Sequence, residues 1–403
     1  MKQNKKIQRI GAAGVITTAA FITVLTYSLV LGMTNTIVNE IVDAFSLSGA
    51  SEGLMGSMVS VGFMASLILI PFAQGRVKKL HALIGAGVLQ TAMLFLSGAS
   101  PVFTMFCVMC VFLGFSGGLI DSYANSSIVD VRGPDSPKYL SYMHGLFAIG
   151  SLATPLLIYR LLLSMEWRGI FYILAVLSIL TALAVLLLTR GRIKGGISAT
   201  TKDQRLTKAD LGIYIRKKRN IMLSLAAFFS MIFQSGLLSW IMRYMTVRYD
   251  AADLGAVALS AYWVCATLNR FCLARLINRT PLQSFAVGAV LSAVVIAAGT
   301  LSGNPVVMCV MVGLAGIVGG HFMPVLISEF AIGYEGKTAF TTSFLMVVMG
   351  IARIIAPLMM AYVTSSISPS ASMMIPTAAA LATAAFGWLA PRSNSECGMR
   401  NSE

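Results

Sequence analysis

The chain has 403 residues, of which 57% are hydrophobic and 11% are charged, and its net charge is +15. A mean hydropathy of +0.81 excludes an ordinary soluble domain of this size. The sequence has no nucleotide-binding loop, zinc-protease motif or serine-hydrolase motif. We therefore expect neither an enzyme nor a protein driven by ATP, and we predict no cofactor and no metal.

Apolar runs follow one another along almost the whole chain, and a helix that spans a bilayer needs roughly 20 apolar residues. The first apolar run continues well past the length of the apolar region of a signal peptide, and no convincing cleavage site follows it, so we expect an uncleaved helix. The sequence thus predicts an all-α membrane protein with twelve transmembrane helices. We place them at 14–38, 53–73, 80–98, 101–127, 138–163, 168–189, 220–246, 254–277, 282–302, 304–330, 338–364 and 369–390.

The second half of the chain repeats the first at a constant offset of 202 residues. Gly114-x-x-Gly117-Gly118 returns as Gly316-x-x-Gly319-Gly320, and Pro155 returns as Pro357. One offset in separate segments indicates two six-helix bundles, a 6+6 pseudo-symmetric repeat. We predict an N-terminal bundle at 1–189, a basic cytoplasmic linker at 190–219, and a C-terminal bundle with a short cytoplasmic tail at 220–403. The repeated small residues should let helices approach closely.

The basic residues indicate the topology. With a cytoplasmic N-terminus, 24 of the 30 Lys and Arg lie in cytoplasmic loops and tails, and four lie outside. This imbalance follows the positive-inside rule, so we expect both termini in the cytoplasm. Basic residues scattered over short loops also argue against a nucleic-acid partner. The pattern suits a multi-pass protein of a bacterial inner membrane.

Charged and strongly polar groups inside spans are the functional candidates, because placing them in hydrocarbon is costly. Asp121 lies in the fourth predicted helix, and Asn125 follows four residues later on the same helix face. A carboxyl group in a low-dielectric cavity can take up and release a proton near neutral pH. We interpret Asp121 as a proton-coupling or substrate-binding group; the alternative is a structural hydrogen bond between helices.

Further polar residues lie at the depth of a central cavity. His144 can pair with Asp121 or line the cavity, and His321 follows the second glycine motif. Arg353 can bind an anionic substrate or form a structural ion pair. The remaining cavity candidates are Asn35 and Gln234.

Four residues near the outer ends of helices have open roles. We expect Trp240 and Tyr244 to anchor the membrane interface or to stack on a sugar ring. Glu40 can reach an outer gate, whereas solvation in a loop accounts for Glu52.

Two sequence blocks carry a resemblance to a known family. Gly75-Arg76-Val77-Lys78-Lys79 resembles the basic loop motif of the major facilitator superfamily, and Asn269-Arg270 through Arg279 echoes it in the second half. This resemblance implies that Arg76, Lys78, Lys79 and Arg270 act at the cytoplasmic loop or gate. The second block, Gly118-x-x-Asp121-x-x-x-Asn125 with Gly133-Pro134-Asp135 and His144-Gly145, is most similar to the fucose permease group of proton-linked sugar symporters.

The resemblance implies a function as well as a fold. In the fucose permease group a helix 4 carboxylate takes part in proton coupling, and Asp121 occupies its place. A second carboxylate, in helix 1, has Asn35 in its position here. We expect a secondary transporter that moves a small polar solute such as a sugar together with protons, by alternating access, as a monomer in the lipid bilayer.

Two other functions stay open. One is a proton-driven exporter of drugs or metabolites. Such exporters usually carry Gly-x-x-x-Gly-Pro-x-x-Gly-Gly in helix 5, which is absent here around Gly145 and Pro155. The other is a membrane receptor or enzyme, which the missing nucleophile and the short linker disfavour.

Overall fold

The computed structural model describes residues 2–73, 77–132, 136–190, 216–272, 280–331 and 338–391. Its contacts divide the chain into two compact units, 1–48 with 54–201 and 49–53 with 202–403. Within the described ranges every regular element is a helix. Most of the predicted linker and Arg76 lie outside the described residues, as does the predicted Gly133-Pro134-Asp135 block.

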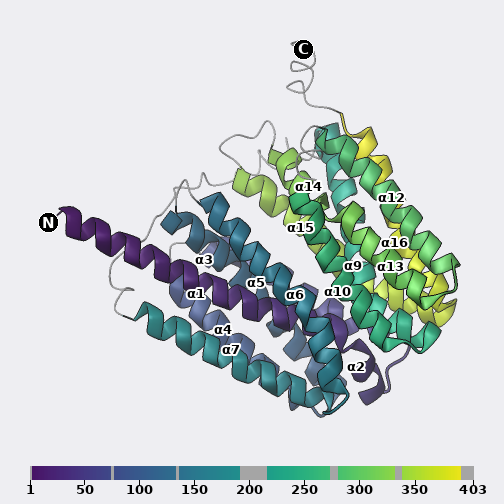
Figure 1. Ribbon diagram of the computed structural model, residues 1–403, viewed down its shortest axis with the longest axis horizontal. Helices are drawn as coiled ribbons and strands as arrows, with labels where there is room; N and C mark the ends of the chain where they lie inside the picture. Colours follow the sequence, from purple (N-terminus) through teal and green to yellow (C-terminus); the bar gives the residue numbers. More distant parts are fainter. Residues whose placement is uncertain are drawn as a thin grey trace, which may run out of the picture. The chain divides into compact units, whose positions relative to one another are not determined.

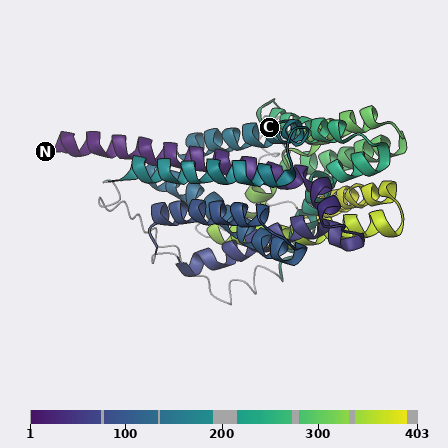
Figure 2. The same cartoon turned by 90° about the horizontal axis from the view of Figure 1, so that it is seen from below.

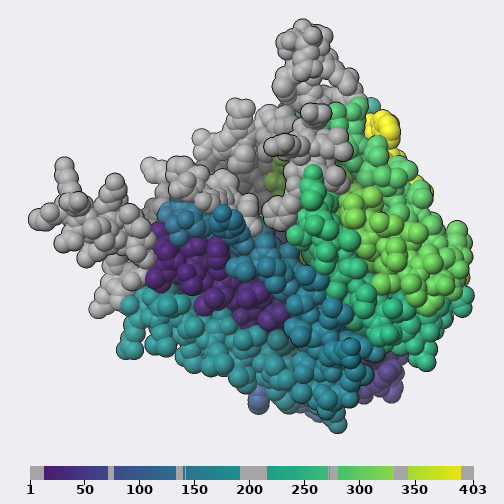
Figure 3. Space-filling model, viewed as in Figure 1, coloured from purple at the N-terminus to yellow at the C-terminus, as the bar shows by residue number. Residues whose placement is uncertain are grey.

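The first unit contains seven α-helices within its described residues (Figure 1). The helix α7 lies alongside α1 in both ribbon views (Figures 1 and 2). On the face drawn in Figure 3, the surface of α1 lies between the surfaces of α6 and α7. The helices are α1 (Lys2–Thr36), α2 (Val38–Ala44), α3 (Leu54–Ala73), α4 (Lys79–Gly98), α5 (Phe103–Arg132), α6 (Ser136–Leu162) and α7 (Trp167–Thr189).

The second unit begins with a short segment taken from the first half of the chain. The 3₁₀ turn η1 (Gly49–Gly53) lies between α2 and α3 in the sequence but packs against α15. Gly49 has a φ of 61°, a left-handed conformation that favours glycine. The α-helices of this unit are α9 (Lys218–Tyr249), α10 (Ala252–Cys272), α12 (Pro281–Leu301), α13 (Pro305–Gly319), α14 (Phe322–Ala331), α15 (Thr338–Ser366) and α16 (Pro369–Leu389).

Each of the twelve predicted spans corresponds to helix in the structure. Eleven segments of the described chain are long and apolar enough to cross a membrane. The helix α10 is not among them; it carries Asp253 at its start and Asn269 and Arg270 near its end. The span predicted at 304–330 is found as one apolar segment, Pro305–Phe330, but its helix is interrupted at Gly320 and His321, which divides it into α13 and α14.

The two units share several helix pairings. In the first unit α3 packs against α5, α4 against α7, and α1 against α6. In the second unit the equivalent pairs are α10 with α13, α12 with α16, and α9 with α15. Pro155 and Pro357 each lie inside the corresponding helix, α6 and α15. The sequence repeat therefore corresponds to helices that pack in equivalent pairs in the two units.

Equivalent glycines lie at close contacts between the paired helices of both units. A Cβ added at Gly114 would overlap the backbone carbonyl of Val59 in α3. A Cβ at Gly316 would overlap the carbonyl of Tyr262 in α10. In lipid, helices associate largely by close van der Waals contact, which small residues permit. The repeated glycine motif thus lets one helix backbone rest on another in both units.

A cluster of aromatic rings fills one end of the first unit. Phe106 of α5 lies edge-on to Trp167 and Phe171 of α7, at 6.0 and 5.8 Å between ring centroids.

Arg168 of α7 donates from Nη1 to the carbonyls of Gly98 and Ser100, at 2.6 and 3.0 Å. These carbonyls lie at the end of α4, where helical partners run out. The bond therefore fixes the end of α4 to the start of α7.

Candidate functional site

Asp121 and Asn125 form a polar pair on α5. The side-chain amide of Asn125 donates to the Asp121 carbonyl at 2.7 Å and to Asp121 Oδ1 at 3.2 Å. Both residues are half-buried, and they lie within the apolar span Phe103–Arg132. A spacing of four residues places the two side chains on one helix face, and the second bond shows that they meet there.

Residues of α1 and α6 pack near the stretch of α5 that precedes this pair. The ring of Tyr27 on α1 lies against Gly117, one turn before Asp121. Phe147 of α6 lies 6.0 Å from the Tyr27 ring, centroid to centroid. His144, one turn earlier on α6, is exposed, and Asn35 is half-buried near the end of α1. Their roles as cavity residues stay predictions.

Gln234 and Arg353 lie on different helices of the second unit. Gln234 of α9 is half-buried, and its Nε2 donates to the hydroxyl of Tyr262 on α10 at 3.2 Å. Tyr262 is fully buried. Arg353 is half-buried on α15. Gln234 thus uses one of its donors within its own unit, and the role of Arg353 stays a prediction.

The interruption between α13 and α14 has an identifiable cause. Pro324 has no N–H, so it cannot donate to the carbonyl of Gly320 four residues earlier, and its ring crowds that carbonyl. Arg270 of α10 donates from Nε to Gly320 O at 3.0 Å instead. We expected Arg270 to reach the cytoplasmic face or a gate. Its observed bond satisfies a helical carbonyl that proline leaves without a partner.

His321 lies at the same break and is 6% exposed. Its Nε2 lies 3.2 Å from the carbonyl of Ser284 on α12, and its Nδ1 lies 3.2 Å from Asn269 Nδ2. A carbonyl only accepts, so Nε2 carries the proton. The Asn269 amide also donates to the carbonyl of Ile317, which fixes its orientation, so Nδ1 is an acceptor. The neutral imidazole thus forms one hydrogen bond with the Ser284 carbonyl and one with the Asn269 amide. His321 therefore belongs to the hydrogen-bond network around the helix break.

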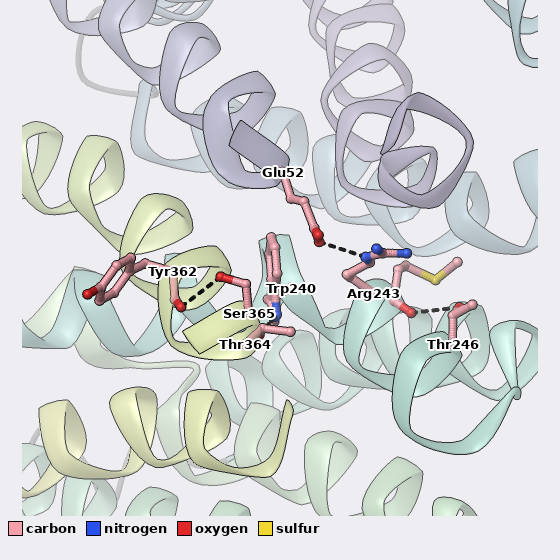
Figure 4. A network of polar contacts seen from close by, with 8 residues as sticks. Glu52, Trp240, Arg243, Thr246, Tyr362, Thr364 and Ser365 are labelled. Atoms are coloured by element: carbon pink, nitrogen blue, oxygen red, sulfur yellow. Dashed lines mark hydrogen bonds and ion pairs between the residues drawn. The ribbon is translucent and has the colours of Figure 1, made fainter. Parts of the chain in front are cut away.

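An ion pair joins η1 to α9 within the second unit (Figure 4). Arg243 Nε donates to Glu52 Oε2 at 2.9 Å, and the two side chains are 15% and 10% exposed. Solvation in a loop, the sequence-based account of Glu52, is therefore wrong. The contact joins residues 191 apart, which no local pattern can show.

Trp240 and Tyr244 both differ from expectation. They are 1% and 0% exposed. Trp240 Nε1 donates to the hydroxyl of Thr364 on α15 at 2.9 Å (Figure 4), and the Tyr244 hydroxyl lies 3.3 Å from that of Tyr249. Buried indole and phenol groups with partners are packing residues. Neither interface anchoring nor stacking on a sugar fits side chains without exposed surface.

Two further ion pairs lie near helix ends. Lys79, from the basic motif, contacts Asp130 of α5 at 2.7 Å between Nζ and Oδ2; Lys78 immediately precedes α4. In the second unit Arg219 binds Glu329 through Nη2 and Oε2 at 2.5 Å, and Nη1 also donates to the Glu329 carbonyl at 2.8 Å. Sequence reasoning missed Glu329, although an acidic residue inside the predicted span 304–330 was a usable signal.

A family model described as Major Facilitator Superfamily matches residues 19–331 of the chain. Among curated proteins there is no match.

Solved structures give the same fold at low sequence identity. The nucleoside transporter NupG has a TM-score of 0.76 at 13% identity, covering 94% of this chain and 100% of its own. A bacterial homologue of the human lysosomal transporter Spinster, inward-facing and unoccupied, has a TM-score of 0.71 at 17% identity, with 95% of each chain covered. The E. coli fucose:proton symporter FucP has a TM-score of 0.64 at 16% identity, covering 94% of this chain and 98% of its own.

These findings confirm the resemblance to the major facilitator superfamily. The match extends over most of the chain, and the helices carry the fold of its structural neighbours. Such proteins bind small molecules within a lipid bilayer, commonly as monomers, and they are not enzymes. The chain belongs to the Major Facilitator Superfamily of membrane transporters.

Proposed function

We propose that this transporter imports a small polar solute, such as a sugar, together with protons by alternating access. The observation that carries the proposal is the hydrogen-bonded pair of Asp121 and Asn125 inside an apolar span. A carboxylate at this depth is expensive, so a functional role is its first interpretation. The similarity of this block to the fucose permease group supports the same role for Asp121.

Protonation would change what the pair offers a solute. An ionised Asp121 only accepts hydrogen bonds, and it accepts one from the Asn125 amide. A protonated Asp121 gains an O–H donor, while Asn125, whose amide nitrogen donates to Asp121, still offers its side-chain oxygen as an acceptor. A solute oxygen placed to accept from this O–H binds the protonated state more tightly than the ionised state. The affinity for the solute can therefore depend on the proton, which is the linkage that symport requires.

The structural neighbours support this class of solute. By their names, one transports nucleosides and another transports fucose with a proton. We further propose that the chain lies in a bacterial inner membrane with both termini in the cytoplasm, following its distribution of basic residues. Asn35, His144, Gln234, His321 and Arg353 stay candidate cavity residues. Of these, His321 has the weakest case, because both ring nitrogens have partners within the second unit.

The test is solute-induced alkalinisation outside energy-starved cells that express the chain, measured over a panel of sugars, polyols and nucleosides. We expect one class of solute to raise the external pH. Asp121→Asn should abolish alkalinisation and uphill accumulation while solute exchange continues. Asp253→Asn is the matched control, because Asp253 is exposed at the start of α10. Accumulation that survives intact in Asp121→Asn would refute the role of Asp121.

Export is the competing function, and the same cells can detect it. If no solute alkalinises the medium, inside-out vesicles should be energised and tested with drugs and organic acids. Uptake into such vesicles that dissipates the proton gradient would establish export and overturn the import proposal.

A further inference from the structure

A small buried cavity lies inside the first unit, between α1, α4, α5 and α7. Its apolar wall includes Leu83 and Ile120, each 1% exposed. The rest of its wall is polar. Five polar side chains line it: Thr23, Thr26, Gln90, Ser178 and Thr181.

Gln90 is the clearest sign that the cavity holds something. The residue is 1% exposed, and its Nε2 has no hydrogen-bond partner among the described residues. A buried amide donor without a partner is unfavourable, and no bulk solvent reaches the hydrocarbon depth of a bilayer to supply one. The side chain lines the cavity, so a ligand there can accept its hydrogen bond.

The threonine hydroxyls have too few protons for their own contacts. Thr26 Oγ1 lies 3.0 Å from the carbonyl of Ile22, and Thr181 Oγ1 lies 2.9 Å from that of Leu177. The two hydroxyl oxygens also lie 2.8 Å from each other. Each hydroxyl has one proton, so two protons face three contacts. Each hydroxyl oxygen has two lone pairs, so both oxygens can still accept a hydrogen bond from a further donor in the cavity.

We propose that this cavity binds one water molecule, which bridges α4 to α1 and α7. The water accepts a hydrogen bond from Gln90 Nε2 and donates to the hydroxyls of Thr26 and Thr181. The cavity has room for about one water molecule. Buried waters commonly make about three hydrogen bonds to polar groups that lack other partners. This site meets that description.

A metal cation is the other occupant of that size, and the lining disfavours it. None of the described residues that line the cavity has a carboxylate, and the amide of Gln90 presents a donor rather than an acceptor. Hard cations need several oxygen ligands. A bound water joins three helices of one unit, so it would make that unit more rigid. Water in this cavity is independent of which solute is transported and in which direction.

The direct test is a structure of the full-length protein at a resolution that shows ordered water. We expect an isolated density peak within hydrogen-bond distance of Gln90 Nε2 and of a threonine hydroxyl. Absence of this peak, with the Gln90 amide bonded to protein instead, would overturn the proposal. A peak with three or more oxygen ligands at cation distances would overturn it in favour of a metal ion.

Thermal unfolding of the purified protein gives an independent test. Thr26→Val should lower the unfolding midpoint by several degrees, because the water loses a partner while Gln90 still needs one. The triple variant Gln90→Met, Thr26→Val, Thr181→Val should recover most of that loss as a dry, apolar site. Thr91→Val is the control, because its hydroxyl bonds only the Gly87 carbonyl and it does not line the cavity.

The same measurement distinguishes water from a cation. A wild-type midpoint that is equal in sodium, potassium and choline chloride supports water. A midpoint raised specifically by sodium, and not raised in Gln90→Met, would refute it. A triple variant that unfolds at lower temperature than Thr26→Val would also refute it, because removing the polar groups should remove the need for water.

Discussion

The ion pair between Arg219 and Glu329 gives the sharpest prediction for stability. The two side chains are 15% and 2% exposed, so the carboxylate is the more deeply buried partner. Arg219→Met leaves that carboxylate buried without its counter-ion, which costs about 3–5 kcal/mol. Glu329→Gln removes a charged hydrogen bond, worth roughly 1.5–3 kcal/mol, and leaves a guanidinium that water can partly reach. Arg219→Met should therefore be the more damaging change.

The assay is thermal unfolding of purified full-length protein in detergent, followed by intrinsic fluorescence. At roughly 2–4 °C per kcal/mol for a unit of this size, Arg219→Met should lower the midpoint by on the order of 10 °C. The double variant Arg219→Met, Glu329→Leu should return close to wild type, because replacing both partners removes the uncompensated charge. Single variants within about a degree of wild type, or Glu329→Gln as the worse of the two, would refute the reasoning.

Three further predictions use the same assay. Gly114→Ala should destabilise the protein by about 1–3 kcal/mol, because a Cβ overlaps the Val59 carbonyl, whereas Gly85→Ala meets nothing within 4 Å and should stabilise by up to about 1 kcal/mol. Burial, and then the nearby charge of Asp43, raise the pKa of Glu40, so the folded protein disfavours its ionised form. Stability is therefore lost as the pH rises from the ordinary pKa of a glutamate to the raised pKa of Glu40. Glu40→Gln should unfold at a higher temperature than wild type at pH 8, and this difference in midpoint should disappear in acid. Asn269→Leu removes the donor to Ile317 O and His321 and should cost about 1–3 kcal/mol; an unchanged midpoint would show that the helix break does not need this residue.

Local patterns determined much of this protein. Apolar runs of spanning length predicted the helices, because a backbone in lipid must satisfy its hydrogen bonds within each segment. The constant offset predicted two similar units, and the equivalent prolines of α6 and α15 lie as expected. The pair of Asp121 and Asn125 was also predictable, since a spacing of four residues fixes neighbours on one helix face.

Other features were hidden because they depend on segments far apart in the chain. Glycine and proline at 320 and 324 signal a weak point in a helix. The carbonyls at this break, however, receive their hydrogen bonds from Arg270 and Asn269, which lie on a different helix. Glu52 resembles a solvated loop residue in the sequence. It binds Arg243, however, because its segment, 49–53, is part of the second unit.

Sequence periodicity therefore decided which segments are helices and which residues share a helix face, because both depend on neighbours along one chain segment. The tertiary structure alone decided which polar groups are satisfied and by what. Gln90 illustrates the difference: nothing near it in the sequence marks it, and its unpartnered amide is visible only once α1, α4 and α7 enclose it. Hydrogen-bond satisfaction depends on distance in space, and packing, rather than sequence spacing, sets that distance.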